Sequence, residues 1–157
     1  MRWITRERPK IDRVACPWLV SRFLDSEPEF LFVAPDQVLT RAAELDAIPY
    51  DVEGVRLSHD GPRCSFDAFL EEYRLAEPAL ADLAVIVRGA DTDRLDLAPQ
   101  SAGLLAVSLG LSYLSRSDQE MLERGFMVYD ALYAWLRHAR QETHTWNPQR
   151  STVPSGQ

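Results

Sequence analysis

The second half of the chain carries the apolar spacing of successive amphipathic helices, and this pattern restricts the fold more than any other feature. From Ser65 onward, apolar residues recur at the i, i+3, i+4, i+7 positions that line one face of a helix. The Ser117–Glu120 spacing is that of a capping box and predicts where the last and longest helix begins. The segment after Pro99 is apolar nearly all round, which predicts a helix at the centre of the core. We expect helices in this half that begin at Ser65, Pro78, Pro99 and Ser117.

The first 60 residues contain shorter apolar runs that are typical of strands. Trp3–Thr5 and Glu29–Val33 each have the composition of a strand. Ile48–Val52 and Val55–Leu57 predict a hairpin, and Pro35 is expected to open a helix. The predicted fold class is therefore α+β and predominantly helical, with a small N-terminal sheet packed against a C-terminal helical half.

Length and composition fit one globular domain. At 157 residues the chain is long enough to bury a core. We expect a single domain over 1–142, followed by a disordered tail over 143–157, where the periodicity stops. The formal net charge of −7 opposes nucleic acid as a partner of the whole surface. No apolar run approaches the roughly 18 residues of a membrane span, and the N-terminus is too charged for a signal peptide, so we expect a cytoplasmic location.

The stretch IDRVACPWLVSRFLD, from Ile11 to Asp25, contains the first candidate site. Pro17 suits the first position of a helix, because its missing N–H costs nothing there, and this would place Cys16 at the N-cap. A thiol at that position and near Arg13 is expected to have a lowered pKa. The functional interpretation is a reactive or metal-binding thiolate, with Asp12 to orient or ligate. The alternative is that Cys16 is a small buried apolar residue.

The stretch SHDGPRCSFD, residues 58–67, repeats this theme. His59 and Cys64 are five positions apart on a Gly-Pro turn and can reach one metal ion, with Asp67 completing or orienting the shell. If the two stretches meet in space, the predicted ligands are Cys16, Cys64, His59, Asp12 and Asp67. Such a mixture of thiolate, imidazole and carboxylate suits zinc, iron or copper. The alternative is a surface turn followed by a helix that Ser65 caps.

Two groups of charged residues offer further candidate sites. Four basic residues near the expected helix start would suit a tetrahedral oxyanion, because guanidinium groups and free N–H groups both bind one. These residues are Arg6, Arg8, Lys10 and Arg13. After Gly89, where a helix is expected to end, alternating acids could hold a hard cation, although Arg94 would oppose one. These acids are Asp91, Asp93 and Asp96. For both groups the alternative is a solvated run of surface charge.

Five longer runs resemble the bacterial chromate resistance protein family. They are WITRERPKIDRVACPWLVSRFLD, FLFVAPDQV, SHDGPRCSFDAFL, VRGADTDRLDLAPQSAGLLAVSLGL and EMLERGFMVYDALYAWLR. The similarity is to the conserved C-terminal domain of that family, sometimes labelled a chromate resistance exported protein, and it runs from about Trp3 to Arg137. In longer family members this domain follows an N-terminal region linked to regulation.

The resemblance implies a role in chromate resistance, either by sensing chromate or by lowering its accumulation. Chromate is a tetrahedral oxyanion and an oxidant, so a basic loop and thiols are groups that could bind it and sense or reduce it. The leading hypothesis is a chromate-responsive domain that binds an oxyanion or a metal ion, with Cys16 and Cys64 as ligands, redox sensors or catalytic groups. One alternative is a metal-dependent or thiol-based enzyme of the reductase or sulfur-transfer type. Another is a helical interaction module that docks a partner or a second copy, as a homodimer, through Tyr129, Tyr133 and Trp135.

Overall fold

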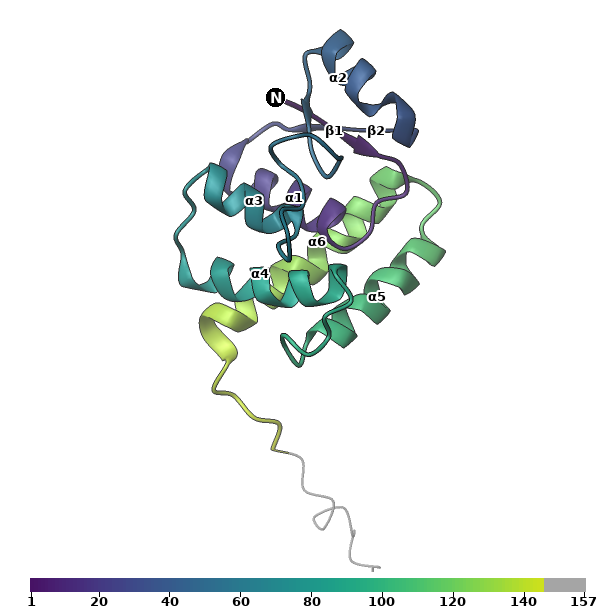
Figure 1. Cartoon of the computed structure of the whole chain (residues 1–157). Helices are drawn as coiled ribbons and strands as arrows, with labels where there is room; N and C mark the ends of the chain where they lie inside the picture. The colour runs from purple at the N-terminus through teal and green to yellow at the C-terminus, as the bar shows by residue number, and fades with distance from the viewer. Residues whose placement is uncertain (146–157) are drawn as a thin grey trace, which may run out of the picture.

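A small parallel sheet lies beside a group of helices in the computed structural model of the chain, which describes residues 1–145 (Figure 1). The strand order is β2-β1-β3, with β1 at Arg2–Arg6, β2 at Glu29–Val33 and β3 at Ile48–Pro49. Both outer strands run parallel to β1. The α+β, predominantly helical fold class is therefore confirmed. The predicted tail over 143–157 lies outside the described residues from 146 onward.

Six α-helices, together with three short turns of other helical types that adjoin them, contain more than half of the described residues. The α-helices are α1 (Asp12–Leu19), α2 (Val38–Leu45), α3 (Ser65–Glu72), α4 (Pro78–Asp91), α5 (Ser101–Leu114) and α6 (Asp118–Ala134). The short turns are π-helical at Val20–Leu24 and Trp135–Ala139 and 3-10 at Pro35–Gln37. Within residues 1–145, no helix combines the length and the apolar character that a bilayer span requires.

The central strand β1 separates two hydrophobic cores, because successive side chains on a strand point to opposite faces. Ile4 faces α2 and packs in a small core with Val38 and Ala42. Trp3 belongs to the larger core that the other helices build. Figure 1 shows this division: α2 covers one side of the sheet and the remaining helices lie on the other.

Helix α1 passes through the middle of the larger core and contacts α3, α4 and α6. Its close approach to α6 depends on Gly125, since a Cβ added there would lie 2.5 Å from Cγ1 of Val14. The beginning of α1 differs from the prediction. The helix starts at Asp12 with Ile11 as its N-cap, and Pro17 lies inside it. Proline inside a helix removes one backbone hydrogen bond and normally destabilises it, but seven of the eight α1 residues are buried and packing maintains the helix.

The predicted hairpin after β3 is wrong. Pro49 is the last residue of β3, and Asp51 follows with a positive φ of 51°, which turns the chain out of the sheet. A loop then runs to Cys64, the N-cap of α3, with a parallel bridge between Tyr50 and Leu57 as its contact with the strand region. The predicted cap at Ser65 is therefore displaced by one residue. This loop carries Asp51 and His59 to the site described below.

Helix α4 continues two residues past its predicted end at Gly89. Gly89 does not end the helix. It allows α4 to pack closely against α5, because a Cβ at this position would lie 2.3 Å from Oγ of Ser101. Asp91 is consequently the last residue of a helix and not part of a free loop. The acidic residues after Gly89 are thus separated, with Asp91 mostly buried and Asp93 exposed.

One prediction about the C-terminal helices is also wrong. Helix α5 is not central to the core: its buried residues are Ser101, Leu104 and Ser108, and it packs against α4 and α6 on one narrow side. The three aromatic residues of the predicted stripe differ in exposure, since Tyr129 is buried whereas Tyr133 and Trp135 are partly buried. Tyr129 is 2% exposed and its hydroxyl donates to the carbonyl of Ile11. The interaction module based on these residues stays a prediction. The predicted cap of α6 is confirmed, since Oγ of Ser117 accepts from the N–H of Glu120.

Candidate metal centre

Three side chains from separate parts of the chain converge beside the start of α1. Asp12 is the first residue of α1, Asp91 is the last residue of α4, and His59 lies in the loop before α3. Nε2 of His59 is 3.2 Å from Oδ2 of Asp12 and 3.1 Å from Oδ2 of Asp91. One ligand atom from each of these residues lies within 4.8 Å of the other two. This separation suits three ligands of one metal ion.

A fourth carboxylate, that of Asp51, adjoins the three. Its Oδ1 lies 3.3 Å from Nε2 of His59 and accepts a hydrogen bond from Oγ of Ser65. Its Oδ2 pairs with the guanidinium groups of Arg6 and Arg13. The two arginines compensate its charge, so Asp51 is fixed at the edge of the cluster and orients its neighbours.

Backbone groups hold the carboxylates of Asp12 and Asp91. The N–H of Ser65 donates to Oδ2 of Asp12, across 3.1 Å, which joins the start of α3 to the start of α1. The N–H of Asp12 donates to Oδ1 of Asp91. Asp12 is 2% exposed, whereas the side chain of His59 is 40% exposed. The cluster therefore has a fixed carboxylate floor from two helices and an imidazole that faces solvent from a loop.

The protonation equilibria of the cluster reflect an excess of buried negative charge. Burial, followed by the charge of Asp12, raises the pKa of the Asp91 carboxyl to about 8. Burial and the same neighbour raise the pKa of Asp51. The hydrogen bond to Asp12 raises the pKa of the His59 imidazole to about 9, although burial opposes the shift. Bound protons thus neutralise part of the negative charge of the carboxylates, and a bound divalent cation would neutralise it instead.

The hydrogen-bonding capacity of His59 also points to a cation. Carboxylate oxygens lie between 3.1 and 3.3 Å from its Nε2 in three directions, yet one imidazole N–H can be donated to one acceptor in good geometry. A metal ion has no such limit, because imidazole nitrogen and several carboxylate oxygens bind it together. The donor set suits zinc, ferrous iron or manganese, which accept mixed nitrogen and oxygen ligands.

Both cysteines lie beneath this cluster and are buried. Burial, followed by the charge of Asp12, raises the pKa of Cys16 and of Cys64. The expected lowering of the Cys16 pKa is wrong, because Cys16 lies in the second turn of α1 and not at its N-cap. Among the described residues, the group whose ligand atoms converge contains no sulfur. The roles of Cys16 and Cys64 as metal ligands or reactive thiols stay predictions.

The Asp67 carboxylate pairs with Arg88 and not with the residues of the cluster. Arg88 donates to both of its carboxylate oxygens, at 2.9 and 2.6 Å. The N–H of Cys64 also donates to Asp67, which forms the capping box of α3. Asp67 therefore anchors α3 to α4 and is absent from the converging group, although the sequence placed it among the ligands.

The basic residues predicted to bind an anion are divided by the fold. Arg6 and Arg13 face Asp51 at the cluster. Arg8 lies on the surface, where its N–H donates to Asp118 at the start of α6, and Lys10 is partly buried. Of the predicted set, Arg6 and Arg13 thus adjoin the candidate metal centre.

A cavity of about 440 Å³ opens beside the cluster and is lined by Arg6, Asp51, Ser58 and His59 among others. Nε of Arg6 is buried and has no hydrogen-bond partner within residues 1–145. The hydroxyl of Tyr50 is also buried and, among the described residues, has no hydrogen-bond partner. It interacts electrostatically with Cys16 and Asp51. Polar donors without partners therefore lie on the inner side of the candidate site.

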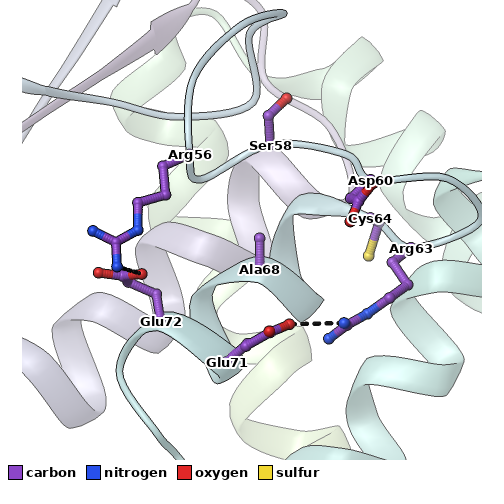
Figure 2. Close-up of a pocket in the computed structure, with 8 residues that line it drawn as sticks. All are labelled: Arg56, Ser58, Asp60, Arg63, Cys64, Ala68, Glu71 and Glu72. Carbon is purple, nitrogen blue, oxygen red and sulfur yellow. Dashed lines mark hydrogen bonds and ion pairs between the residues drawn. The ribbon is translucent and has the colours of Figure 1, made fainter.

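A second cavity, of about 290 Å³, lies on the other side of the loop and reaches Cys64 (Figure 2). Figure 2 shows the ion pair of Arg63 with Glu71 on one side and Arg56 beside Glu72 on the other. Both arginines have carboxylate partners, so this cavity carries no surplus of positive charge. It gives a route toward the Cys64 thiol rather than a second ligand set.

Sequence reasoning found Asp12 and His59 but missed the roles of Asp51 and Asp91. Asp91 had been grouped with Asp93 and Asp96, and Asp51 carried no signal of its own. A prediction that the helix continues through Gly89 would have placed Asp91 at the helix end and separated it from Asp93 and Asp96. For Asp51 the only sequence cue is an acid directly after a strand.

The fold and the cluster define a small α+β domain with a carboxylate–imidazole centre between α1, α4 and a loop. The family model of the ChrB C-terminal domain matches residues 3–136. The chain belongs to this chromate resistance protein family, and the resemblance seen in its sequence is confirmed. Protein ChrB of Cupriavidus metallidurans is 31% identical over 140 residues, which cover 88% of this chain and 42% of that protein. The chain therefore spans less than half the length of this relative. No solved structure matches.

Proposed function

We propose that this domain binds one divalent metal ion through Asp12, His59 and Asp91, and that it acts in chromate resistance through that ion. The observation that carries the proposal is the convergence of the three ligand atoms within 4.8 Å. Membership of the chromate resistance family supports the biological role. The donor set favours zinc, ferrous iron or manganese over copper(I), which prefers thiolates.

An oxyanion is a second candidate ligand, and the cavity beside Arg6 favours it. With His59 neutral and three carboxylates ionised, a divalent ion and two arginines would leave the site with one net positive charge. That charge and the unpartnered Nε of Arg6 suit an oxyanion such as chromate, because charge-assisted hydrogen bonds to arginine are strong. Arg8 and Lys10 are not part of the proposal.

The roles proposed for the thiols and for catalysis depend on opening of the structure. Cys16 and Cys64 are buried with raised pKa values, and a buried protonated thiol reacts slowly. A redox-sensing, ligand or catalytic role would therefore require the loop that bears His59 to move. A metal-dependent or thiol-based enzyme remains an alternative on the same site.

Metal titration of purified protein tests the proposal. We expect the metal-free chain to bind one equivalent of Zn²⁺ or Mn²⁺, and Asp91→Asn and His59→Ala to weaken binding by at least about tenfold. Asp93→Asn and His138→Ala are matched controls, since both residues are exposed, and they should bind like the wild type. Binding that is absent in the wild type, or equal in Asp91→Asn and Asp93→Asn, would contradict the proposed site.

The link to chromate is tested separately in cells. Bacteria that depend on this chain for chromate survival are expected to lose protection with Asp91→Asn and to keep it with Asp93→Asn. Equal survival with the two variants would show that the metal site has no part in resistance.

A further inference from the structure

Helix α5 presents an uncharged apolar face to solvent. None of its fourteen residues is charged, and its buried residues are Ser101, Leu104 and Ser108. Its exposed residues are Ala102, Gly103, Ala106, Val107, Leu109, Gly110, Tyr113 and Leu114. Tyr113 is 93% exposed and Leu114 is 65% exposed. Figure 1 shows α5 along the outer edge of the molecule.

The exposed residues are ordered by size around the helix. At 100° per residue, the small residues Ala106, Gly110 and Gly103 fall within an arc of about 60° at the middle of the face. Larger side chains flank this arc, with Leu109 and Tyr113 on one side and Val107 and Leu114 on the other. A Cβ added at Gly110 would meet nothing within 4 Å, so the middle of the face is open. Small residues between larger ones allow the backbone of a second helix to approach closely.

We propose that this face is the contact between two copies of the chain, with their α5 helices packed antiparallel about a twofold axis. Charge favours a second copy in this arrangement. Each chain has a net charge of −7, so two copies repel each other over most of their surfaces, whereas α5 carries no charge. Isologous contacts of this kind are the commonest way in which identical chains pair.

The ends of α5 add charge complementarity to the arrangement. The segment before α5 exposes Asp93, Arg94 and Asp96; Arg94 pairs with Asp96, so the segment has a net charge of −1, whereas Arg116 is exposed directly after α5. In an antiparallel pair, each acidic end lies beside the Arg116 end of the other copy, and the helix dipoles are opposed. A parallel pair would place like charges together. The interface uses no residue of the metal centre and does not depend on the proposed function.

Sedimentation equilibrium across a micromolar to millimolar range tests the proposal. The wild-type chain is expected to approach twice its monomer mass, whereas Ala106→Arg stays at the monomer mass because its charge would enter the middle of the contact. Ala81→Arg is the matched control, since Ala81 is an exposed alanine on α4, and it should associate like the wild type. Circular dichroism confirms that both variants fold. A wild type that remains monomeric throughout, or an Ala106→Arg variant that still dimerises, would overturn the proposal.

The antiparallel arrangement has its own test. Arg116→Glu is expected to weaken association, and adding Asp93→Lys to it should restore association by exchanging the two charges without breaking the Arg94–Asp96 pair. Oxidation of an Ala106→Cys variant should give a covalent dimer, while Ala81→Cys should not. Failure of the charge exchange together with an absence of crosslinking would reject this contact even if the chain dimerises elsewhere.

Discussion

Replacement of Gly125 by alanine tests the packing that holds α1, and with it Asp12, against α6. The added Cβ would lie 2.5 Å from Cγ1 of Val14, whereas carbon atoms prefer separations of about 3.5–4.0 Å. Val14 is 1% exposed, and β-branched side chains in helices keep one χ1 rotamer. The overlap must therefore be relieved by separating α1 from α6.

Two opposing effects set the size of the change. Alanine stabilises a helix interior by about 1 kcal/mol relative to glycine, whereas overpacking a core typically costs about 1–3 kcal/mol. Because Val14 has little freedom to move, we expect the overpacking to prevail and the free energy of unfolding to fall by about 1–2 kcal/mol. For a chain of this size the melting temperature should fall by roughly 2–8 °C.

Urea denaturation, followed by the fluorescence of the buried Trp3 and Trp18, measures the loss. In a Gly125→Ala and Val14→Ala double variant the new methyl group occupies the space that valine leaves, so the losses should be non-additive by about 1 kcal/mol. Gly103→Ala, studied at low protein concentration, is a control that should be neutral or stabilising, because its Cβ would meet nothing within 4 Å. The reasoning is refuted if Gly125→Ala stabilises the chain as Gly103→Ala does, or if the double variant is simply additive.

Three further predictions concern the buried charges and thiols. The pKa of Asp91 is about 8 in the folded chain and about 4 when unfolded. The folded state binds more protons between these values, so the metal-free chain loses stability as the pH rises through this range. Asp91→Asn should reduce that slope in calorimetric melts, while the raised pKa values of Asp51 and His59 leave part of it, and equal slopes would contradict the prediction. Arg88→Met leaves the buried Asp67 unpaired and should cost about 3 kcal/mol in urea denaturation; a cost below about 1 kcal/mol would contradict a structural ion pair. Cys16 and Cys64 should react with a thiol reagent far more slowly in the native chain than in urea, and equal rates would contradict their burial.

Local pattern was sufficient to predict most elements of this fold. The strand around Trp3 and the cap at Ser117 follow from neighbours in the sequence, and both are confirmed. The prediction of a hairpin after β3 failed because Asp51 adopts a positive φ, and an alternating apolar pattern does not predict such a turn. The prediction that α5 is central to the core failed because apolar composition alone does not distinguish a helix inside the core from one that exposes an apolar face.

The candidate site was half predictable for a related reason. Asp12 and His59 stand in stretches whose residue types suggest metal chemistry. Asp91 is 79 positions from Asp12 in sequence, and its place depends on α4 continuing past Gly89 to pack against Ser101. The error about Cys16 has a local cause, because Pro17 was assigned to the first turn of α1 and lies in its interior.

Anomalous diffraction from a crystal of the chain grown with Mn²⁺ or Zn²⁺ tests the central claim most directly. The account predicts one strong peak about 2 Å from Nε2 of His59 and from carboxylate oxygens of Asp12 and Asp91. A peak at the thiols of Cys16 and Cys64 alone, or a crystal with no ordered metal at a concentration far above the measured dissociation constant, would contradict it.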